Sequence, residues 1–176
     1  MLGETYEMVM DHARFVAEKV AHTPDQIIAY RMEGEHYYTE SYDKPSIKLG
    51  FGGGRGMVNL APKGYTESYF KKYDDFVSAS KPVILVRNVF IGPLTIDFDK
   101  TVTLISHKTG AKSYYNLHPK SGSVRSHVTG SSYDKNSQKK FEIEGSWLDQ
   151  IRLRDCTTNE MEVIWEAPAL EPEAHL

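Results

Sequence analysis

The stretch TVTLISHKTGAKSYYNL, residues 101–117, decides how this chain folds. Two runs rich in Thr, Val, Leu, Ile and Tyr flank Lys108-Thr109-Gly110, where Gly suits the positive φ of a tight turn. Along Thr101–Ser106, apolar side chains fall on both faces of the predicted strand. The stretch therefore predicts an antiparallel hairpin, and strands that are partly apolar on both faces suit a closed barrel.

The same pattern extends in both directions from this hairpin. Short segments rich in β-branched and aromatic residues alternate with Gly, Pro, Asp and Asn, and Asp99-Lys100 is predicted to be a tight link. We expect a mainly β fold with little helix, an antiparallel meander that closes into a near-complete β-barrel. The predicted strands are Gln26–Met32, Ser46–Leu49, Tyr65–Phe70, Val83–Val89, Leu94–Phe98, Thr101–Ser106, Ala111–Leu117, Val124–Gly130, Lys140–Glu144 and Leu148–Leu153.

Composition sets the class of protein. At 176 residues the chain is expected to form one domain. The 21 Lys and Arg against 24 Asp and Glu give a net charge of −3, which offers no general attraction for nucleic acid. No apolar run reaches the roughly 20 residues of a membrane-spanning helix, and the N-terminus lacks the features of a signal peptide. With Cys156 as the one cysteine, a cytoplasmic protein without disulfides is expected.

Motifs for catalysis, metals and cofactors are weak. The glycine-rich segment Gly50–Gly56 lacks the Lys-Ser/Thr ending and the helix of a phosphate loop. The seven histidines show no zinc spacing, and no nucleophile elbow occurs. The basic and aromatic run Tyr69–Tyr73 is cancelled by Asp74-Asp75, which argues against nucleic-acid binding. We therefore predict neither an enzyme nor a metal or cofactor site.

The two ends of the chain read differently from its middle. Between Glu4 and His22 the apolar spacing fits a helical stripe slightly better than a strand. The segment after Cys156 carries several Glu residues and two Pro residues. We expect residues 156–176 to form an acidic, poorly packed tail.

A family resemblance appears near the N-terminus. Leu2-Gly3-Glu4-Thr5-Tyr6-Glu7 resembles the L-G-E-T-Y-E segment of the oxysterol-binding protein family, and Glu18–Pro24 resembles its signature E-Q-V-S-H-H-P-P. The resemblance spans about Leu2 to Leu153. Weaker similarities follow in the same order at Val86–Gly92, Thr109-Gly110, Val128-Thr129-Gly130, Tyr133-Asp134 and Ile143–Trp147.

The resemblance implies a near-complete β-barrel around an apolar tunnel that holds one sterol or phospholipid. It also implies that Glu4–Met10 and Arg14–His22 are paired strands, although the apolar spacing between Glu4 and His22 slightly favours a helix. Residues 1–155 are expected to form this lipid-binding domain in incomplete form, without the lid and the C-terminal helical region of the family.

The resemblance also implies a lipid head-group site. In the family signature, paired histidines bind the phosphate of an inositol head group; here His22 matches the first and Thr23 replaces the second. Because a hydroxyl carries no positive charge and Asp25 adds a negative one, this site is expected to be weakened. The alternative is that His22 ends a strand and is capped by the turn Thr23-Pro24-Asp25. Lys19, three residues earlier, lies on the opposite face of a regular strand.

These features favour a lipid-binding or lipid-transfer module that carries a sterol or phospholipid and acts as a cytoplasmic protein, peripheral at membranes. We expect transient contact with a membrane surface, no nucleic acid, and self-association through an exposed barrel edge. The alternative is a non-transporting interaction protein that uses the barrel scaffold for docking. A histidine-based enzyme on a β-sandwich is a third and weaker hypothesis.

Overall fold

The computed structural model describes residues 1–22, 27–50, 56–118 and 126–168. These residues form strands and turns, and none of them is helical. The strands are β1 (Thr5–Met10), β2 (Ala13–Ala21), β3 (Ile27–Gly34), β4 (Tyr37–Gly50), β5 (Met57–Lys63), β6 (Tyr65–Phe70), β7 (Asp75–Ser80), β8 (Val83–Arg87), β9 (Thr95–Ser106), β10 (Lys112–His118), β11 (His127–Tyr133), β12 (Lys139–Ser146), β13 (Gln150–Asp155) and β14 (Met161–Glu166).

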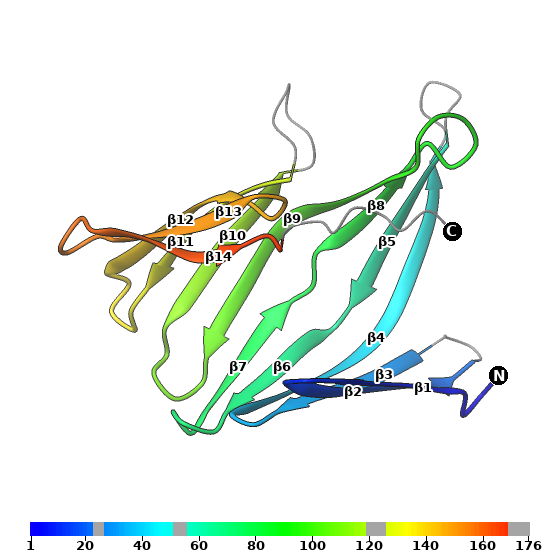
Figure 1. The fold of residues 1–176 in the computed structure, drawn as a ribbon, viewed down its shortest axis with the longest axis horizontal. Coiled ribbons are helices and arrows are strands. Elements are labelled where there is room, and N and C mark those ends of the chain that lie inside the picture. Colours follow the sequence, from blue (N-terminus) through cyan, green and yellow to red (C-terminus); the bar gives the residue numbers. More distant parts are fainter. Residues whose placement is uncertain (23–26, 51–55, 119–125, 169–176) are drawn as a thin grey trace.

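All strands belong to one antiparallel sheet, whose main path is β1-β2-β3-β4-β5-β8-β9-β10-β11-β12-β13-β14, with β6 and β7 off this path between β4 and β9 (Figure 1). The two longest strands, β4 and β9, each pair with different neighbours along their length. The first part of β4 pairs with β6 and its second part with β5, while β9 pairs with β8 and then β7. The fold is thus a meander with a break across its middle, and the prediction of a mainly β, antiparallel fold is confirmed.

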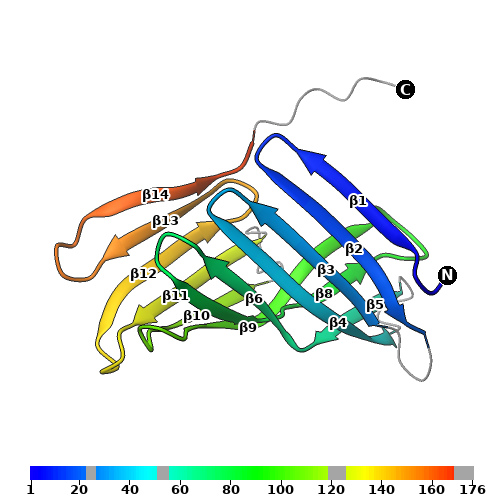
Figure 2. The same cartoon turned by 90° about the horizontal axis from the view of Figure 1, so that it is seen from below.

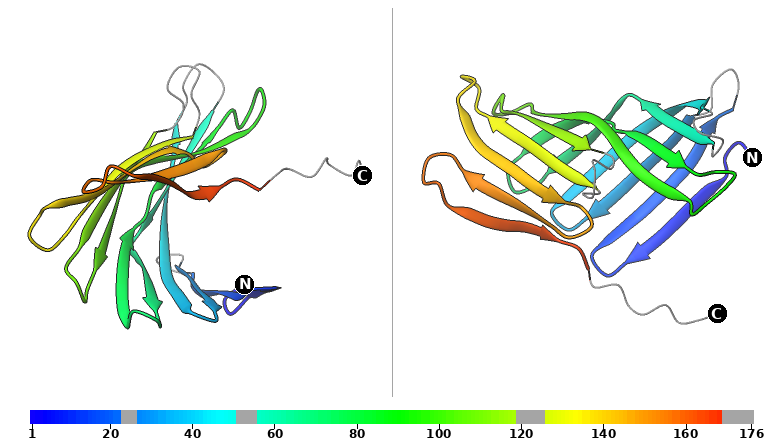
Figure 3. Two further views of the ribbon diagram at one scale, coloured as in Figure 1. Left: turned by 60° about the vertical axis from the view of Figure 1, so that its left-hand side comes forward. Right: turned by 90° about the horizontal axis from the view of Figure 1, so that it is seen from above.

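The sheet curves strongly, so that its two edge strands lie on either side of one opening (Figures 2 and 3). Within the described residues, β1 and β14 pair only with β2 and β13, and the sheet stays open between them. A single curved layer buries few side chains. Among the described residues, the buried apolar ones are Ala13, Val83, Leu85, Val128 and Ile143.

The hairpin predicted from residues 101–117 is confirmed. Ile105 lies opposite Lys112, and Gly110 has a φ of 72° at the turn between them. The tight link predicted at Asp99-Lys100 is wrong, because β9 continues through it. Lys100 adopts a φ of 80°, its N–H bonds the Asp99 carboxylate at 2.8 Å, and the strand changes partner there from β8 to β7.

At the N-terminus the prediction of paired strands is confirmed and the helical alternative is wrong, because β1 and β2 pair from Thr5↔Glu18 to Met10↔Ala13. At the other end, the segment predicted to be poorly packed contains β14. This strand pairs with β13, yet all six of its residues are exposed. Its backbone hydrogen bonds rather than its side-chain packing hold it in place.

Candidate functional site

The two faces of the sheet differ in chemistry. Residues directly opposite each other in register share a face, and neighbours along a strand alternate between faces. Traced in this way, one face is apolar on most of the strands and carries the buried Ala13, Val128 and Ile143. Its apolar side chains include Phe15, Ala17, Tyr30, Met32, Ile47, Leu49, Val58, Leu60, Val77, Ala79, Ile84, Val86, Ile96, Phe98, Val102, Leu104, Tyr115, Leu117, Ile151 and Leu153.

Part of this apolar face is open. Ile47, Leu49 and Ile96 are 62%, 70% and 61% exposed although they lie in strands of the sheet. Leu49, Val58, Val86 and Ile96 follow one another across β4, β5, β8 and β9. An exposed apolar surface of this kind in a folded domain marks a place where a ligand or partner binds.

A buried polar cluster interrupts the apolar face at the break in the sheet. The Lys81 side chain is only 6% exposed; its ammonium pairs with the Asp43 carboxylate and donates to the Tyr42 carbonyl oxygen at 3.1 Å. Burial lowers the pKa of Lys81. Lys81 lies between β7 and β8, beside Pro82, which has no backbone N–H, and Gly64, with a φ of 109°, separates β5 from β6.

The cluster extends by hydroxyl groups toward β3. Ser41, which is 2% exposed, donates to the Asp43 carboxylate at 2.9 Å, and Thr66 donates to Ser41 at 3.4 Å. The Tyr30 hydroxyl is 3.4 Å from the Thr66 hydroxyl, so it is the last group in this series of hydrogen-bonded side chains. Its ring packs against Phe15 on the apolar face, with 5.7 Å between ring centroids. A hydroxyl held in this way can bond a polar group of an otherwise apolar ligand.

The predicted head-group residues fall at the end of β2. His22 is exposed and directly follows the strand, whereas Thr23 lies outside the described residues. The regular alternation assumed for Lys19 and His22 is wrong, because the pairing of β2 with β3 shifts between Lys19 and Ala21. Lys19 lies opposite Ile28 and Ala21 opposite Ile27, which leaves Val20 as an extra residue.

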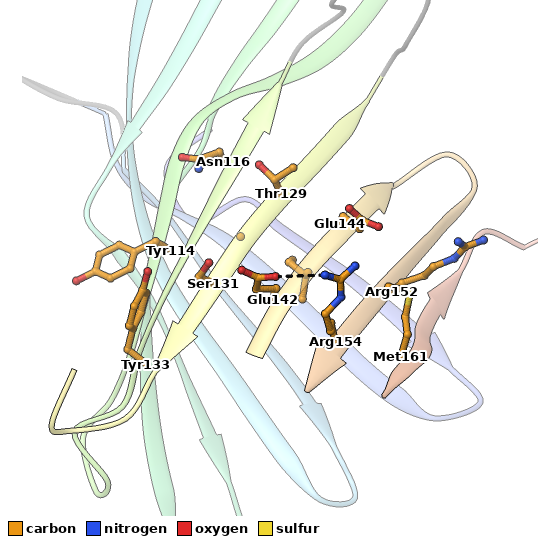
Figure 4. Close-up of a pocket in the computed structure, with 12 residues that line it drawn as sticks. Tyr114, Asn116, Thr129, Ser131, Tyr133, Glu142, Glu144, Arg152, Arg154 and Met161 are labelled. Carbon is orange, nitrogen blue, oxygen red and sulfur yellow. Dashed lines mark ion pairs between the residues drawn. The ribbon is translucent and has the colours of Figure 1, made fainter. Parts of the chain in front are cut away.

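The other face of the sheet is mixed: it carries the buried Val83 and Leu85 on β8, and it is polar over β10 to β14. A groove of about 380 Å³ lies over β10 to β14. Figure 4 shows the side chains that line it, which are mainly tyrosine, hydroxyl and charged groups. Arg154 and Lys139 lie 3.9 Å and 2.8 Å from the Glu142 carboxylate. The hydrogen bond from Lys139 is the main cause that lowers the pKa of Glu142. Glu142 is thus paired with two cations at the surface of this groove.

Among the residues with described positions, no group of three or more His, Cys, Asp and Glu side chains could hold a metal ion. The described part of the chain also contains no helix long and apolar enough to cross a membrane. The polar cluster was missed by sequence reasoning because its members are far apart in the chain. Lys81 and Asp43 are 38 residues apart, and no local motif signals their contact.

A family model described as "Oxysterol-binding protein" matches residues 1–175. The chain belongs to the oxysterol-binding protein family. The resemblance read from Leu2–Glu7 and Glu18–Pro24 is thereby confirmed. Human oxysterol-binding protein-related protein 2 is 33% identical over 153 residues, which cover 85% of this chain and 31% of that protein. Rat oxysterol-binding protein-related protein 1 is 31% identical over 162 residues, which cover 90% of this chain and 17% of that protein. The chain thus spans a third or less of the length of these family members.

Solved structures have the same fold. The Osh3 ORD from Saccharomyces cerevisiae in complex with PI(4)P superposes with a TM-score of 0.75 at 24% identity, over 96% of this chain and 44% of that one. The Osh1 ORD domain in complex with ergosterol gives a TM-score of 0.82 at 18% identity, over 97% and 45%. At these identities the likeness concerns the fold. The chain therefore shares the β-sheet fold of part of these ORD structures.

Proposed function

We propose that this chain binds one sterol or phospholipid against the apolar face of its curved sheet and takes part in lipid transfer. The observation that carries the proposal is the open apolar row at Leu49 and Ile96, on the same face as the polar cluster at Tyr30. Burying such a surface against a lipid yields about 25 cal/mol per Å². The solved relatives hold PI(4)P and ergosterol, which supports a lipid of either kind as ligand.

In this proposal the polar cluster anchors the ligand. A sterol carries one hydroxyl, and the Tyr30 hydroxyl lies at one end of the cluster, on the same face of the sheet as the open apolar row. Behind it, Thr66, Ser41 and Asp43 form a connected chain that fixes the orientation of each hydroxyl. The cluster supplies a polar contact in an apolar setting, which is the usual composition of a small-molecule site.

Native mass spectrometry of the purified chain, with a cholesterol and phosphoinositide binding panel, tests this function. We expect one lipid per chain, and we expect Tyr30→Phe to weaken cholesterol binding about fivefold by removing one hydrogen bond. Tyr6→Phe, which removes an exposed hydroxyl at the sheet edge, is the matched control and should bind as the wild type does. The absence of saturable binding to every lipid in the panel would refute the proposal.

The head-group site at His22 and Thr23 is proposed to be weak, because one imidazole replaces a pair. We also propose that the chain acts in the cytoplasm, peripherally at membranes, with transient contact to their surface, and that it catalyses no reaction. A vesicle sedimentation assay tests the membrane contact. Recovery of the chain in the supernatant at every lipid composition would argue against it.

A second candidate function is docking of a protein partner without lipid transport. It is supported by the two edge strands: Val9 in β1 is 80% exposed and Val163 in β14 is 52% exposed. Such edges can pair with another strand, including one from a second copy. Analytical ultracentrifugation over a concentration series tests self-association, and a monomer at all concentrations would exclude it.

A further inference from the structure

The face of the sheet opposite the apolar face carries two rows of aromatic side chains. Tyr38, Tyr69 and Phe76 follow one another across β4, β6 and β7, with 5.3 Å and 4.7 Å between neighbouring ring centroids. Farther along the same face of β4 and β6, Tyr42 and Tyr65 are 67% and 61% exposed. We call these five residues the tyrosine surface. Exposed tyrosines held on strands are typical of protein interfaces.

Charged side chains separate the two aromatic rows. Glu40 on β4 lies directly opposite Glu67 on β6, and like charges in this position destabilise a sheet. Glu40 is neutralised by Arg31 at 2.5 Å. Glu67 accepts a hydrogen bond from the Ser78 hydroxyl at 3.5 Å but forms no ion pair with any side chain that the structure describes. Glu67 is therefore an exposed carboxylate that a cation from outside can neutralise.

Acidic side chains outnumber basic ones on this face of β1 to β7. The strand register places five glutamates and two arginines there. Both arginines are already paired: Arg14 lies 3.0 Å from Glu7, and Arg31 lies 3.2 Å from Glu33 and 2.5 Å from Glu40. The remaining negative charge repels an anionic membrane and attracts a cationic partner.

A hollow of about 440 Å³ adjoins the tyrosine surface on β2 to β4. Ala29 and Tyr42 give it apolar surface, and Glu18 lines it without an ion pair to any side chain of described position. The Arg31 guanidinium lies 4.4 Å from the centroid of the Tyr38 ring, so one cation already rests against an aromatic ring on this face. The same face thus offers rings and carboxylates to further cations.

We propose that the tyrosine surface and its hollow bind an extended, basic segment of a partner protein, whose Lys or Arg side chains pair with Glu67 and Glu18. The strands β2, β3, β4 and β6 are consecutive neighbours (Figure 2). Glu18 and Glu67 are therefore about 15 Å apart, which an extended chain crosses in about four to five residues. The apolar stems of the basic side chains pack on the rings of Tyr42 and Tyr65. The site lies opposite the proposed lipid site and does not depend on it.

Binding of the purified chain to an array of short synthetic peptides tests the proposal. Each peptide carries two Lys or Arg residues in a background of Ser, Thr and Val, and their separation varies from about two to about eight residues. Matched peptides carry Glu at the same positions. We expect the tightest binding at a separation of about four to five residues, weaker binding as the salt concentration rises, and no binding of the Glu peptides.

Fluorescence anisotropy with the tightest peptide then tests the residues. Glu67→Gln should weaken binding about fivefold, because it removes one exposed ion pair, and Glu67→Asp should stay within about twofold of the wild type. Tyr65→Leu should weaken binding about threefold, because it keeps an apolar side chain but removes the aromatic ring. Glu162→Gln, at an exposed position of β14, is the matched control and should bind as the wild type does.

The outcomes separate a basic partner from the alternatives. Binding that follows the separation of the basic residues and requires Glu67 supports the proposal. Equal binding of basic and Glu peptides, no binding of any peptide, or a Glu67→Gln chain that binds like the wild type would overturn it. If Glu67→Gln lowers sedimentation with phosphatidylserine vesicles, this surface meets a membrane and the proposal is also overturned. Cholesterol binding should be the same in Glu67→Gln and the wild type, so a failure of the proposed lipid function is recognised separately.

Discussion

Removing Asp43 alone from the buried Lys81–Asp43 pair should cost much more than removing both partners. Asp43→Ala leaves an ammonium whose side chain is 6% exposed with the Tyr42 carbonyl as its remaining acceptor. Breaking a buried pair in this way costs about 3 kcal/mol. Lys81→Met removes the cation itself and leaves an Asp43 side chain that is 29% exposed and still bonded by Ser41. We expect this change to cost about 1 kcal/mol.

The double variant Asp43→Ala with Lys81→Met should then resemble Lys81→Met alone, since no buried charge remains without a partner. The expected coupling between the two sites is therefore about 2 to 3 kcal/mol. Urea unfolding followed by circular dichroism gives the four free energies of unfolding. Lys112→Met, at an exposed strand position, should change stability by less than about 0.5 kcal/mol. Additive costs in the double variant, or an Asp43→Ala cost no larger than that of Lys81→Met, would refute the reasoning.

Three further predictions concern other parts of the chain. The pKa of Asp75 is lowered mainly by the hydrogen bond from the Ser106 hydroxyl, at 2.5 Å. The ionised Asp75 should therefore stabilise the fold above about pH 4, and this stabilisation should be lost as the pH falls through the lowered pKa. Acid unfolding of Asp75→Asn should not show this loss, and a profile identical to that of the wild type would contradict the prediction. Gly145→Ala should destabilise by more than about 2 kcal/mol in urea, because φ is 148° and a Cβ would lie 2.1 Å from the Gln150 carbonyl oxygen. Thr23→His should strengthen binding to phosphoinositide vesicles more than to cholesterol; equal affinities on acidic vesicles would argue against a head-group site.

The sequence predicted the elements with strong alternation and clear turns. Tyr65–Phe70 matches β6 residue for residue, and the hairpin at Gly110 has the expected turn. Of the strand Tyr37–Gly50, the sequence predicted only Ser46–Leu49, because Glu40, Asp43 and Pro45 interrupt the apolar pattern before it. Long strands that bend at polar residues do not show a regular period, so their length cannot be read locally.

The candidate site was harder to predict than the fold. His22 could be found from the family signature, which is a local pattern. The bulge at Val20 could not, since it depends on the register between β2 and β3 rather than on any single residue. The pair of Lys81 with Asp43 depends likewise on strand order, which brings β7 and β4 together through β6.

The thin core links the stability of this domain to its proposed ligand. A single curved sheet leaves Ile47, Leu49 and Ile96 more than half exposed, so the apolar face does not contribute its full burial energy without an occupant. A ligand that binds only the folded chain stabilises it by about 2.7 kcal/mol when the free ligand concentration is a hundred times the Kd. The buried Lys81–Asp43 pair fixes the sheet at its break and does not depend on a ligand. We therefore propose that the cluster maintains the shape of the face, and that the bound lipid covers the apolar surface that the sheet leaves open.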